Sequence, residues 1–290
     1  MKLQRIIQFS FFLSVFATNK PTSICRCLYG QSCWPKEHEF ATLAMQLSQP
    51  LLYPLPPASA CYPPSAPSGN CSSVIANYTN GNWRSDQPGS MQNTNFETFI
   101  FPNDTISACF LNATLRFPCG QGSVPPVGVD ARSADDIRVA INFAKQHNLK
   151  LAIKNTGHDY LGRSTARGGF LIWTHNMKDI SYNPLFVPQG APVTTGNTFN
   201  GDFPPYFSVY FRSLPSYMQA VTLGAGVQWH DAYDFVQKQG RFILGGISPG
   251  ASVGAAGGWV MGGGHSFFSP KFGLGTPSSF PINPISLHST

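Results

Sequence analysis

The sequence predicts an α+β domain that follows an irregular, disulfide-tied N-terminal segment. Three observations support this prediction. Helical and strand patterns alternate over residues 129–244, all seven cysteines lie within the first 119 residues, and Pro, Ser and Asn are abundant over residues 34–128. The chain has 290 residues and is 42% hydrophobic, so it can bury a core, and its length allows one or two domains.

The first residues are typical of a secretory signal peptide. Lys2 and Arg5 precede an apolar run over residues 6–17, which is shorter than the about 20 residues that a bilayer span needs. We therefore expect residues 1–23 to be a signal peptide, the protein to be secreted, and no segment to span a membrane. A buried N-terminal helix is the alternative.

Residues 24–122 are expected to form a cysteine-rich, glycosylated segment. Disulfides are favoured over a metal site, because the first cysteines lack histidine partners at zinc-ligand spacing. An odd number of cysteines leaves one thiol unpaired, unless its partner is missing from this chain. The cysteines are Cys25, Cys27, Cys33, Cys61, Cys71, Cys109 and Cys119, and the four glycosylation sequons begin at Asn70, Asn77, Asn103 and Asn112.

A helix and a strand are predicted directly after this segment. Ser133 is typical of a helix N-cap, with the acidic Asp136 three positions on, and apolar residues then recur at i, i+3, i+4 and i+7 from Ile137. This helix should end near residue 148. Apolar and polar residues alternate over residues 149–154, which predicts a half-buried strand.

Further elements alternate toward the C-terminus. The apolar run over residues 170–173 predicts a buried strand, and residues 220–223 predict another. Apolar residues repeat at helical spacing from Trp229, and Gly240 is typical of the residue that follows a helix. The alternation predicts a mixed domain with helices packed on a sheet.

Two loops carry the candidate functional residues. Residues 153–164 form a polar turn after the predicted strand, with His158 between a glycine and an aspartate. Such a turn exposes consecutive backbone N–H groups, which suits a diphosphate. Residues 245–266 are so rich in glycine that a large ligand or another backbone must approach them closely. Together the loops predict a nucleotide-type cofactor.

The charge pattern does not favour nucleic-acid binding. The net charge is +6 and the pI is near 9.0, but only 11% of the residues are charged and no run of Lys or Arg stands out. A nucleic-acid interface would be denser in basic residues and clustered, so the basic balance indicates a solvated surface.

Six short motifs follow one another along the second half of the chain. They are Ala-Arg-Ser-Ala-Asp-Asp-Ile (131–137), Lys-Asn-Thr-Gly-His-Asp (154–159), Leu-Gly-Ala-Gly (223–226), Ser-Val-Gly-Ala-Ala-Gly-Gly-Trp (252–259), Gly-Gly-Gly-His-Ser (262–266) and Lys-Phe-Gly-Leu-Gly (271–275). In this order they resemble flavoproteins with the FAD-binding domain of the vanillyl-alcohol-oxidase (VAO) type, also called PCMH-type, in the branch of berberine-bridge-enzyme-like oxidases. The chain is most similar there to secreted isoamyl alcohol oxidases, over residues 25–200 and 220–275.

The resemblance implies an incomplete PCMH-type FAD-binding domain over residues 123–275, with FAD bound covalently through the imidazole of His158. A turn histidine bonded to Asp159 is the alternative. Many relatives attach the flavin a second time through a cysteine of the second loop. Here Ser248 or Gly250 stands at that position, so we predict attachment through His158 only. The covalent bond would raise the reduction potential of the flavin, which favours taking hydride from a poor donor.

Other residues of the two loops are expected to bind the cofactor, and no metal site is expected. Arg163 could equally be an ordinary surface residue, and the second loop could be a glycine-rich turn packed on helices. His230 and His265 are considered as bases, but packing or polar-surface roles are favoured, so the catalytic residues stay unknown. The expected cofactor-binding residues besides His158 are Lys154, Asn155, Thr156, Gly157, Asp159, Gly162, Arg163, Ser164, Ser248, Gly250, Gly254, Gly257 and Gly258.

Residues 201–219 and 276–290 depart from the resemblance. The first stretch is an atypical insertion and the second a tail outside the family pattern, which we interpret as a retained intron and a missed splice. The expected function is a secreted FAD-dependent oxidase that passes hydride from an alcohol or related small molecule to FAD and then to O₂. The alternatives are a carbohydrate or secondary-metabolite oxidase, an inactive truncated FAD-binding glycoprotein, and a cysteine-rich adhesion module. The substrate and the oligomeric state are left open.

Overall fold

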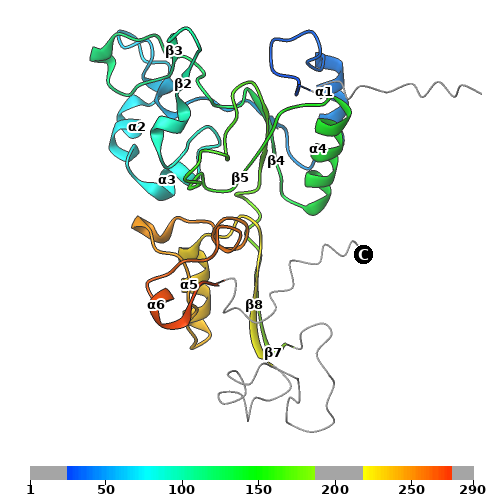
Figure 1. Ribbon diagram of the computed structural model, residues 1–290, viewed down its shortest axis with the longest axis vertical. Helices are drawn as coiled ribbons and strands as arrows, with labels where there is room; N and C mark the ends of the chain where they lie inside the picture. The colour runs from blue at the N-terminus through cyan, green and yellow to red at the C-terminus, as the bar shows by residue number, and fades with distance from the viewer. Residues whose placement is uncertain (1–24, 187–217, 276–290) are drawn as a thin grey trace, which may run out of the picture.

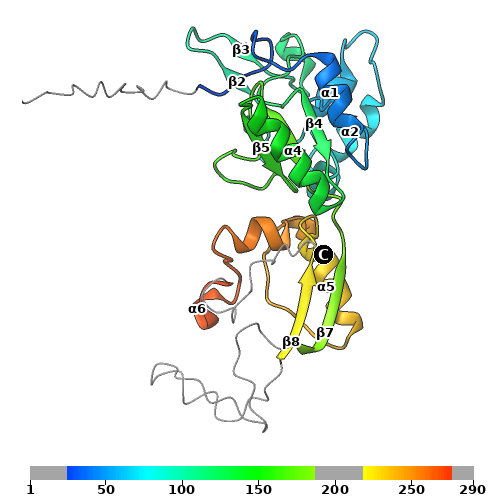
Figure 2. The same ribbon diagram turned by 90° about the vertical axis from the view of Figure 1, so that its right-hand side faces the viewer.

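The computed structural model of the chain describes residues 25–186 and 218–275. Figures 1 and 2 show two parts, one with β1 to β6 and α1 to α4, the other with β7, β8, α5 and α6. The helices are α1 (Glu37–Ala44), α2 (Cys71–Asn77), α3 (Gly81–Ser85), α4 (Ala134–Gln146), α5 (Trp229–Lys238) and α6 (Ser269–Phe272). The strands are β1 (Leu51–Leu52), β2 (Phe99–Ile100), β3 (Ile106–Ser107), β4 (Val127–Asp130), β5 (Leu151–Lys154), β6 (Phe170–Trp173), β7 (Ile180–Phe186) and β8 (Met218–Leu223).

The first part is built on a four-stranded sheet in the order β1-β4-β6-β5. Strands β4, β6 and β5 are parallel, and Phe170 of β6 lies in register with Val127 on one side and Leu151 on the other. The short strand β1 pairs antiparallel with β4, with Leu51 opposite Val129. The N-terminal segment therefore supplies one strand of the sheet.

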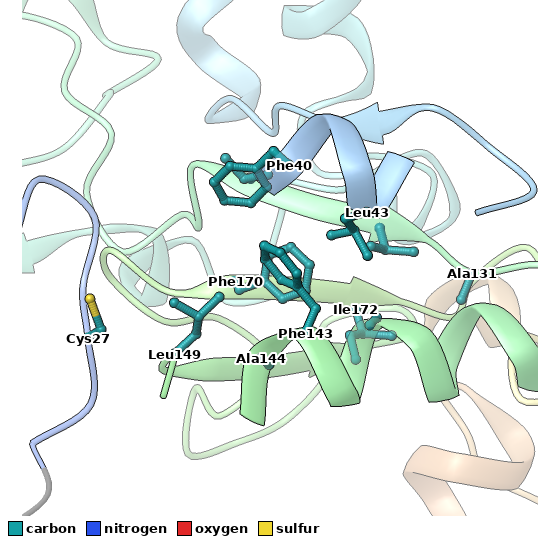
Figure 3. Close-up of a cluster of buried hydrophobic side chains, with 12 residues drawn as sticks. Cys27, Phe40, Leu43, Ala131, Phe143, Ala144, Leu149, Phe170 and Ile172 are labelled. Carbon is teal, nitrogen blue, oxygen red and sulfur yellow. The ribbon is translucent and has the colours of Figure 1, made fainter. Parts of the chain in front are cut away.

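One face of this sheet holds the main core. Phe170 and Ile172 of β6 point to that face, where α1 contributes Phe40 and α4 contributes Phe143 (Figure 3). The rings of Phe143 and Phe170 have centroids 5.7 Å apart. The intervening residue Leu171 faces the other side with a second, smaller cluster, as the alternation of side chains along a strand requires.

Helix α4 confirms the predicted helix and its N-cap. Ser133 accepts a hydrogen bond from the backbone N–H of Asp136, and the Asp136 carboxylate accepts one from the backbone N–H of Ser133. This reciprocal pair satisfies N–H groups that the first turn of a helix leaves without partners. The Asp136 carboxylate also accepts from the backbone N–H of Ser48, so the cap joins the N-terminal segment to the sheet.

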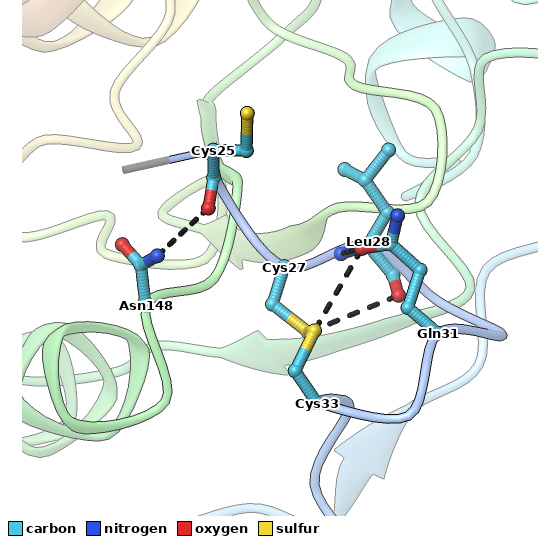
Figure 4. Close-up of a disulfide and its surroundings, with 6 residues drawn as sticks. All are labelled: Cys25, Cys27, Leu28, Gln31, Cys33 and Asn148. Carbon is cyan, nitrogen blue, oxygen red and sulfur yellow. Dashed lines mark hydrogen bonds between the residues drawn. A yellow bond between two sulfur atoms is a disulfide. The ribbon is translucent and has the colours of Figure 1, made fainter. Parts of the chain in front are cut away.

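Three disulfides tie the N-terminal segment: Cys27–Cys33, Cys61–Cys71 and Cys109–Cys119. Figure 4 shows the first of these disulfides. Cys25 takes part in none of the three. Cys27 also forms a β-bridge with Leu149, which fastens the segment next to β5. The disulfide prediction is confirmed.

The segment is less irregular than its composition predicts, because it contains α1, α2, α3 and the β2–β3 pair. The physical reason lies in the asparagines, which are abundant in loops but also cap helices. Asn70 accepts from the backbone N–H of Ser73 at the start of α2, and Asn80 caps α3 in the same way. Short capped helices of this kind carry too little periodicity to be predicted.

The second part pairs β7 with β8 in an antiparallel ribbon, with Ile180 opposite Leu223. Helix α5 follows and ends before Gly240, whose φ of +65° confirms the predicted C-terminal glycine. Trp229 of α5 packs in a cluster that includes Ala255, in a π-helix over residues Ala255–Val260. The strand predicted over residues 220–223 is confirmed as β8, which begins two residues earlier, at Met218.

Some expectations fall outside the described residues. They are the signal peptide over residues 1–23, the tail over residues 276–290 and most of the insertion over residues 201–219. Within residues 25–186 and 218–275, no helix is long and apolar enough to cross a bilayer, and no three potential metal-ligating side chains gather in one place.

Candidate functional site

The predicted polar turn leaves the sheet at the carboxyl end of β5. We call residues 154–159 the 154–159 turn. Because β4, β5 and β6 are parallel, their carboxyl ends meet at one edge of the sheet, where α/β proteins commonly bind ligands. Asn155 follows β5 at this edge, and its side-chain oxygen lies 3.3 Å from Nδ1 of His175, which follows β6. The edge is therefore polar and ordered by side-chain contacts.

The backbone of the turn has the form of an anion cradle. Gly157 has a φ of +83°, which residues with a side chain adopt at a cost, and a Cβ there would lie 3.0 Å from the Ser90 carbonyl oxygen. Among the described residues, the backbone N–H groups of Thr156, Gly157, His158 and Asp159 have no hydrogen-bond acceptor. Consecutive N–H groups around a left-handed residue can bind a phosphate or diphosphate.

His158 projects from this cradle and contacts the second loop. Its Nε2 lies 2.9 Å from Oγ of Ser252, a side chain that is itself buried. Burial lowers the pKa of His158 to about 4, so the imidazole is neutral at pH 7. A neutral imidazole keeps a lone pair that can act as a nucleophile.

The alternative in which His158 bonds to Asp159 is wrong. The Asp159 carboxylate instead accepts the backbone N–H of Leu161 at 3.1 Å and of Arg163 at 2.7 Å, and it pairs with the Arg163 guanidinium. These bonds, first of all the side-chain bond from Arg163, lower the pKa of Asp159. The Arg163 side chain is exposed and its guanidinium binds the Asp159 carboxylate. This agrees with the interpretation of Arg163 as an ordinary surface residue. The pair closes the loop after the turn.

Two further predicted residues of the first loop, Lys154 and Gly162, have structural roles. The Lys154 side chain is buried, and its amine donates to the backbone carbonyls of Gln87, Pro88 and Ser90. Burial lowers the pKa of that amine to about 7, although the negative charge of Glu97 acts to raise it. Gly162 has a positive φ, and a Cβ there would lie 2.6 Å from a ring carbon of Phe96, so it serves packing. Ser164 is half-buried in the same loop.

The second loop meets the 154–159 turn at Ser252 and Gly254. The Ser248 hydroxyl accepts from the backbone N–H of Ser252 at 2.9 Å, and the two hydroxyl oxygens lie 3.3 Å apart. Ser248 therefore contacts Ser252, which in turn contacts His158. A Cβ on Gly254 would lie 2.3 Å from the side-chain nitrogen of Asn155, which donates to the backbone carbonyl of Ala225. Gly250 has a φ of +68°.

The glycines of the second loop fall into two groups. Gly245 and Gly246 pack against Trp229, because a Cβ on Gly245 would lie 2.3 Å from a ring carbon. The alternative of a glycine-rich turn packed on a helix therefore holds for these two. Gly257 and Gly258 differ, since a Cβ on either would meet no described atom within 4 Å.

Within the part of the chain that the structure describes, neither His230 nor His265 forms a hydrogen bond or ion pair with the 154–159 turn. His230 pairs with Asp231 within α5, with 3.0 Å between Nε2 and Oδ1. His265 contributes its backbone carbonyl to the indole N–H of Trp259 at 2.6 Å. Both contacts correspond to the packing and polar roles that the sequence favours.

Sequence reasoning missed two residues of the site. Ser252 is the first residue of the motif over residues 252–259. Its place four residues after Ser248 could have indicated that it lies at the site. Gln92 carries no such signal, yet its backbone N–H donates to the Gly157 carbonyl at 3.0 Å and its side-chain amide to the Thr156 carbonyl at 3.1 Å.

The residues of the turn fit an FAD cofactor. The open N–H groups suit its diphosphate, and the neutral imidazole of His158 belongs to the same turn. Comparison with known proteins leads to the same cofactor. Residues 125–194 match the model of an FAD-binding domain family. The match begins two residues before β4 and contains the 154–159 turn.

Relatives extend the match over most of the chain. An FAD-linked oxidoreductase of Arthroderma benhamiae is 40% identical over 252 residues, which are 87% of this chain and 39% of that protein. An FAD-linked oxidoreductase of Emericella nidulans is 33% identical, over 86% of this chain and 40% of that protein. The crystal structure of a VAO-type flavoprotein from Myceliophthora thermophila superposes with a TM-score of 0.66 at 30% identity, over 86% of this chain and 40% of that one.

Over most of its length the chain is similar to VAO-type FAD-linked oxidoreductases. The predicted α+β PCMH-type fold and the FAD cofactor are thereby confirmed. The chain spans about two fifths of the length of the relatives it matches. The narrower similarity to isoamyl alcohol oxidases stays a prediction.

Proposed function

We propose that the chain holds FAD in the 154–159 turn, with His158 as its single covalent anchor, and that the whole protein is an oxidase. The observation that carries the proposal is the neutral, mostly buried imidazole of His158 at the end of an open N–H cradle. Flavin accepts a hydride when bound, so an alcohol or a related small molecule would be the donor and O₂ the final acceptor.

Several contacts support a single anchor. Ser252 holds one ring nitrogen of His158, which limits rotation of the imidazole. The two positions where a cysteinyl bond is expected carry Ser248 and Gly250, and neither has a thiol. The six cysteines in disulfides all lie in the N-terminal segment. The second loop therefore offers the flavin no thiol for a second bond.

The test is whether flavin colour stays with the polypeptide after acid precipitation. We expect a yellow pellet from the unaltered chain and a colourless one from His158→Ala, with mass spectrometry assigning the flavin to the peptide with His158. His230→Ala is the matched control, because it removes another histidine from the fold and should leave the pellet yellow. A cysteinyl-flavin peptide, or a yellow His158→Ala pellet, would refute the single anchor.

We further propose that the protein is secreted and glycosylated. The side chains of Asn70, Asn103 and Asn112 are exposed, whereas Asn77 is half-buried and donates its amide N–H to the Ser73 carbonyl at 2.9 Å. Glycans should therefore occupy Asn70, Asn103 and Asn112. Mass spectrometry before and after enzymatic deglycosylation of secreted protein tests this, and an unmodified mass would contradict it.

A further inference from the structure

Gln92 contacts the 154–159 turn from the N-terminal segment. Its backbone N–H donates to the Gly157 carbonyl at 3.0 Å, and its side-chain amide donates to the Thr156 carbonyl at 3.1 Å. These are two consecutive carbonyls of the cradle. Gln92 is half-buried, so water competes little for these bonds.

The orientation of these carbonyls decides where the N–H groups point. A trans peptide is planar, and its C=O and N–H point in opposite directions. The Thr156 carbonyl shares a peptide unit with the Gly157 N–H, and the Gly157 carbonyl shares one with the His158 N–H. Because Gln92 holds both carbonyls on its own side, the two N–H groups are turned away from it, toward the side left for an anion.

Gln92 is itself held firmly. Its side-chain nitrogen also lies 2.9 Å from the Gly81 carbonyl and 3.1 Å from the Ser85 hydroxyl. The preceding residue, Met91, is buried, and its Cα would lie 3.1 Å from a Cβ on Gly157. The turn therefore has little room to flip its peptide units without displacing residues 81–92.

A buried group of charges fixes the same stretch. Arg84 pairs with Glu97, and the Glu97 carboxylate accepts from the backbone N–H of Met91 at 2.8 Å. Arg84 Nε donates to the Met91 carbonyl at 2.8 Å. The Lys154 amine joins the stretch to the last residue of β5 through three carbonyls. Both sides of Gln92 are therefore tied to the frame on which the turn begins.

We propose that Gln92 is a positioning residue for the cofactor, which orients the Gly157 and His158 peptide units so that their N–H groups bind the FAD diphosphate. The inference rests on the proposed function, because it requires that the 154–159 turn holds FAD. It gives the N-terminal segment a part in cofactor binding.

The experiment measures FAD and riboflavin affinity by quenching of flavin fluorescence, in the full chain with His158→Ala so that binding is reversible. Gln92→Met keeps the length of the side chain and removes its amide, and with it the bond to the Thr156 carbonyl, while the backbone N–H can still donate to the Gly157 carbonyl. We expect FAD to bind about tenfold more weakly, as loss of an orienting hydrogen-bond donor implies. Riboflavin has no phosphate, so its affinity should stay unchanged.

Gln121→Met is the matched control. Gln121 lies in the same segment and donates to the carbonyls of Pro54 at 2.8 Å and Val124 at 3.2 Å, but to none of the turn. It should leave both affinities unchanged. If Gln92→Met fails to fold, Gln92→Asn withdraws the amide by one methylene and should weaken FAD in the same selective way.

The outcomes distinguish the role of Gln92 from the proposal that the 154–159 turn holds FAD. Gly157→Ala is measured in parallel and should weaken FAD. If Gly157→Ala weakens FAD and Gln92→Met does not, the inference alone is overturned. It is also overturned if Gln92→Met weakens FAD and riboflavin equally, or if Gln121→Met has the same effect. If FAD does not bind, or Gly157→Ala changes nothing, the proposed function falls and the inference falls with it.

Discussion

Covalent incorporation of FAD should depend on pH in a way that the burial of His158 sets. In the proposed attachment the neutral imidazole would be the nucleophile, and burial lowers the pKa of His158 to about 4. At pH 5 about nine tenths of such a group is neutral, whereas a histidine at its ordinary pKa of about 6.5 would be only about 3% neutral. The structure therefore predicts incorporation at pH 5 about 30-fold faster than an exposed histidine would allow.

The assay adds FAD to flavin-free chain between pH 4 and pH 8 and follows the flavin retained after acid precipitation. We expect the initial rate to be nearly constant above pH 5 and to halve near pH 4. His158→Ala serves as the blank, and circular dichroism checks that the chain stays folded at each pH. A rate that halves near pH 6.5 would refute the reasoning, because it would mean that the imidazole titrates as if exposed.

Three further predictions follow from other contacts. In the flavin-free chain, the pKa of His158 is about 4 when folded and about 6.5 when unfolded, so the unfolded state binds more protons between these pH values. The free energy of unfolding therefore decreases as the pH is lowered from 6.5 to 4. The loss should reach ~3 kcal/mol at pH 4 in urea unfolding, and an equal loss in His158→Asn would contradict it. Gly254→Ala places a Cβ 2.3 Å from the Asn155 amide and should weaken FAD binding about tenfold by fluorescence titration; an unchanged affinity would show that the loop can yield. Asp136→Ala removes the carboxylate that accepts from the backbone N–H of Ser133 at the start of α4 and from Ser48, and should lower the free energy of unfolding by about 2–3 kcal/mol, whereas a change below about 0.5 kcal/mol would argue against that role.

The local elements of the FAD-binding part were predictable from sequence. Helix α4 begins one residue after the predicted N-cap Ser133 and ends two residues before the predicted 148, because capping and a 3.6-residue period are local signals. Strand β6 has the predicted bounds, since four buried apolar residues stand between glycine and polar residues. The turn with His158 follows β5 as expected.

The contacts that assemble the site were not predictable in the same way. Gln92 and Ser252 reach the turn from positions 65 and 95 residues away from Gly157 in sequence, and no local pattern encodes such separations. The pairing of β1 with β4 was missed for the same reason, because a strand of two residues has no period. Arg163 shows a different limit: its type suits a phosphate, but Asp159 was a nearer partner.

The pairing of β1 with β4 affects where this protein can be shortened. Sequence composition places a boundary at about residue 123, and a piece that starts there would keep β4 but lose its neighbour. Val129 and Gly128 would then present open backbone groups along a strand edge, and such edges recruit strands from other molecules. A shortened version would be prone to aggregate, so useful truncations should keep Leu51 and Leu52.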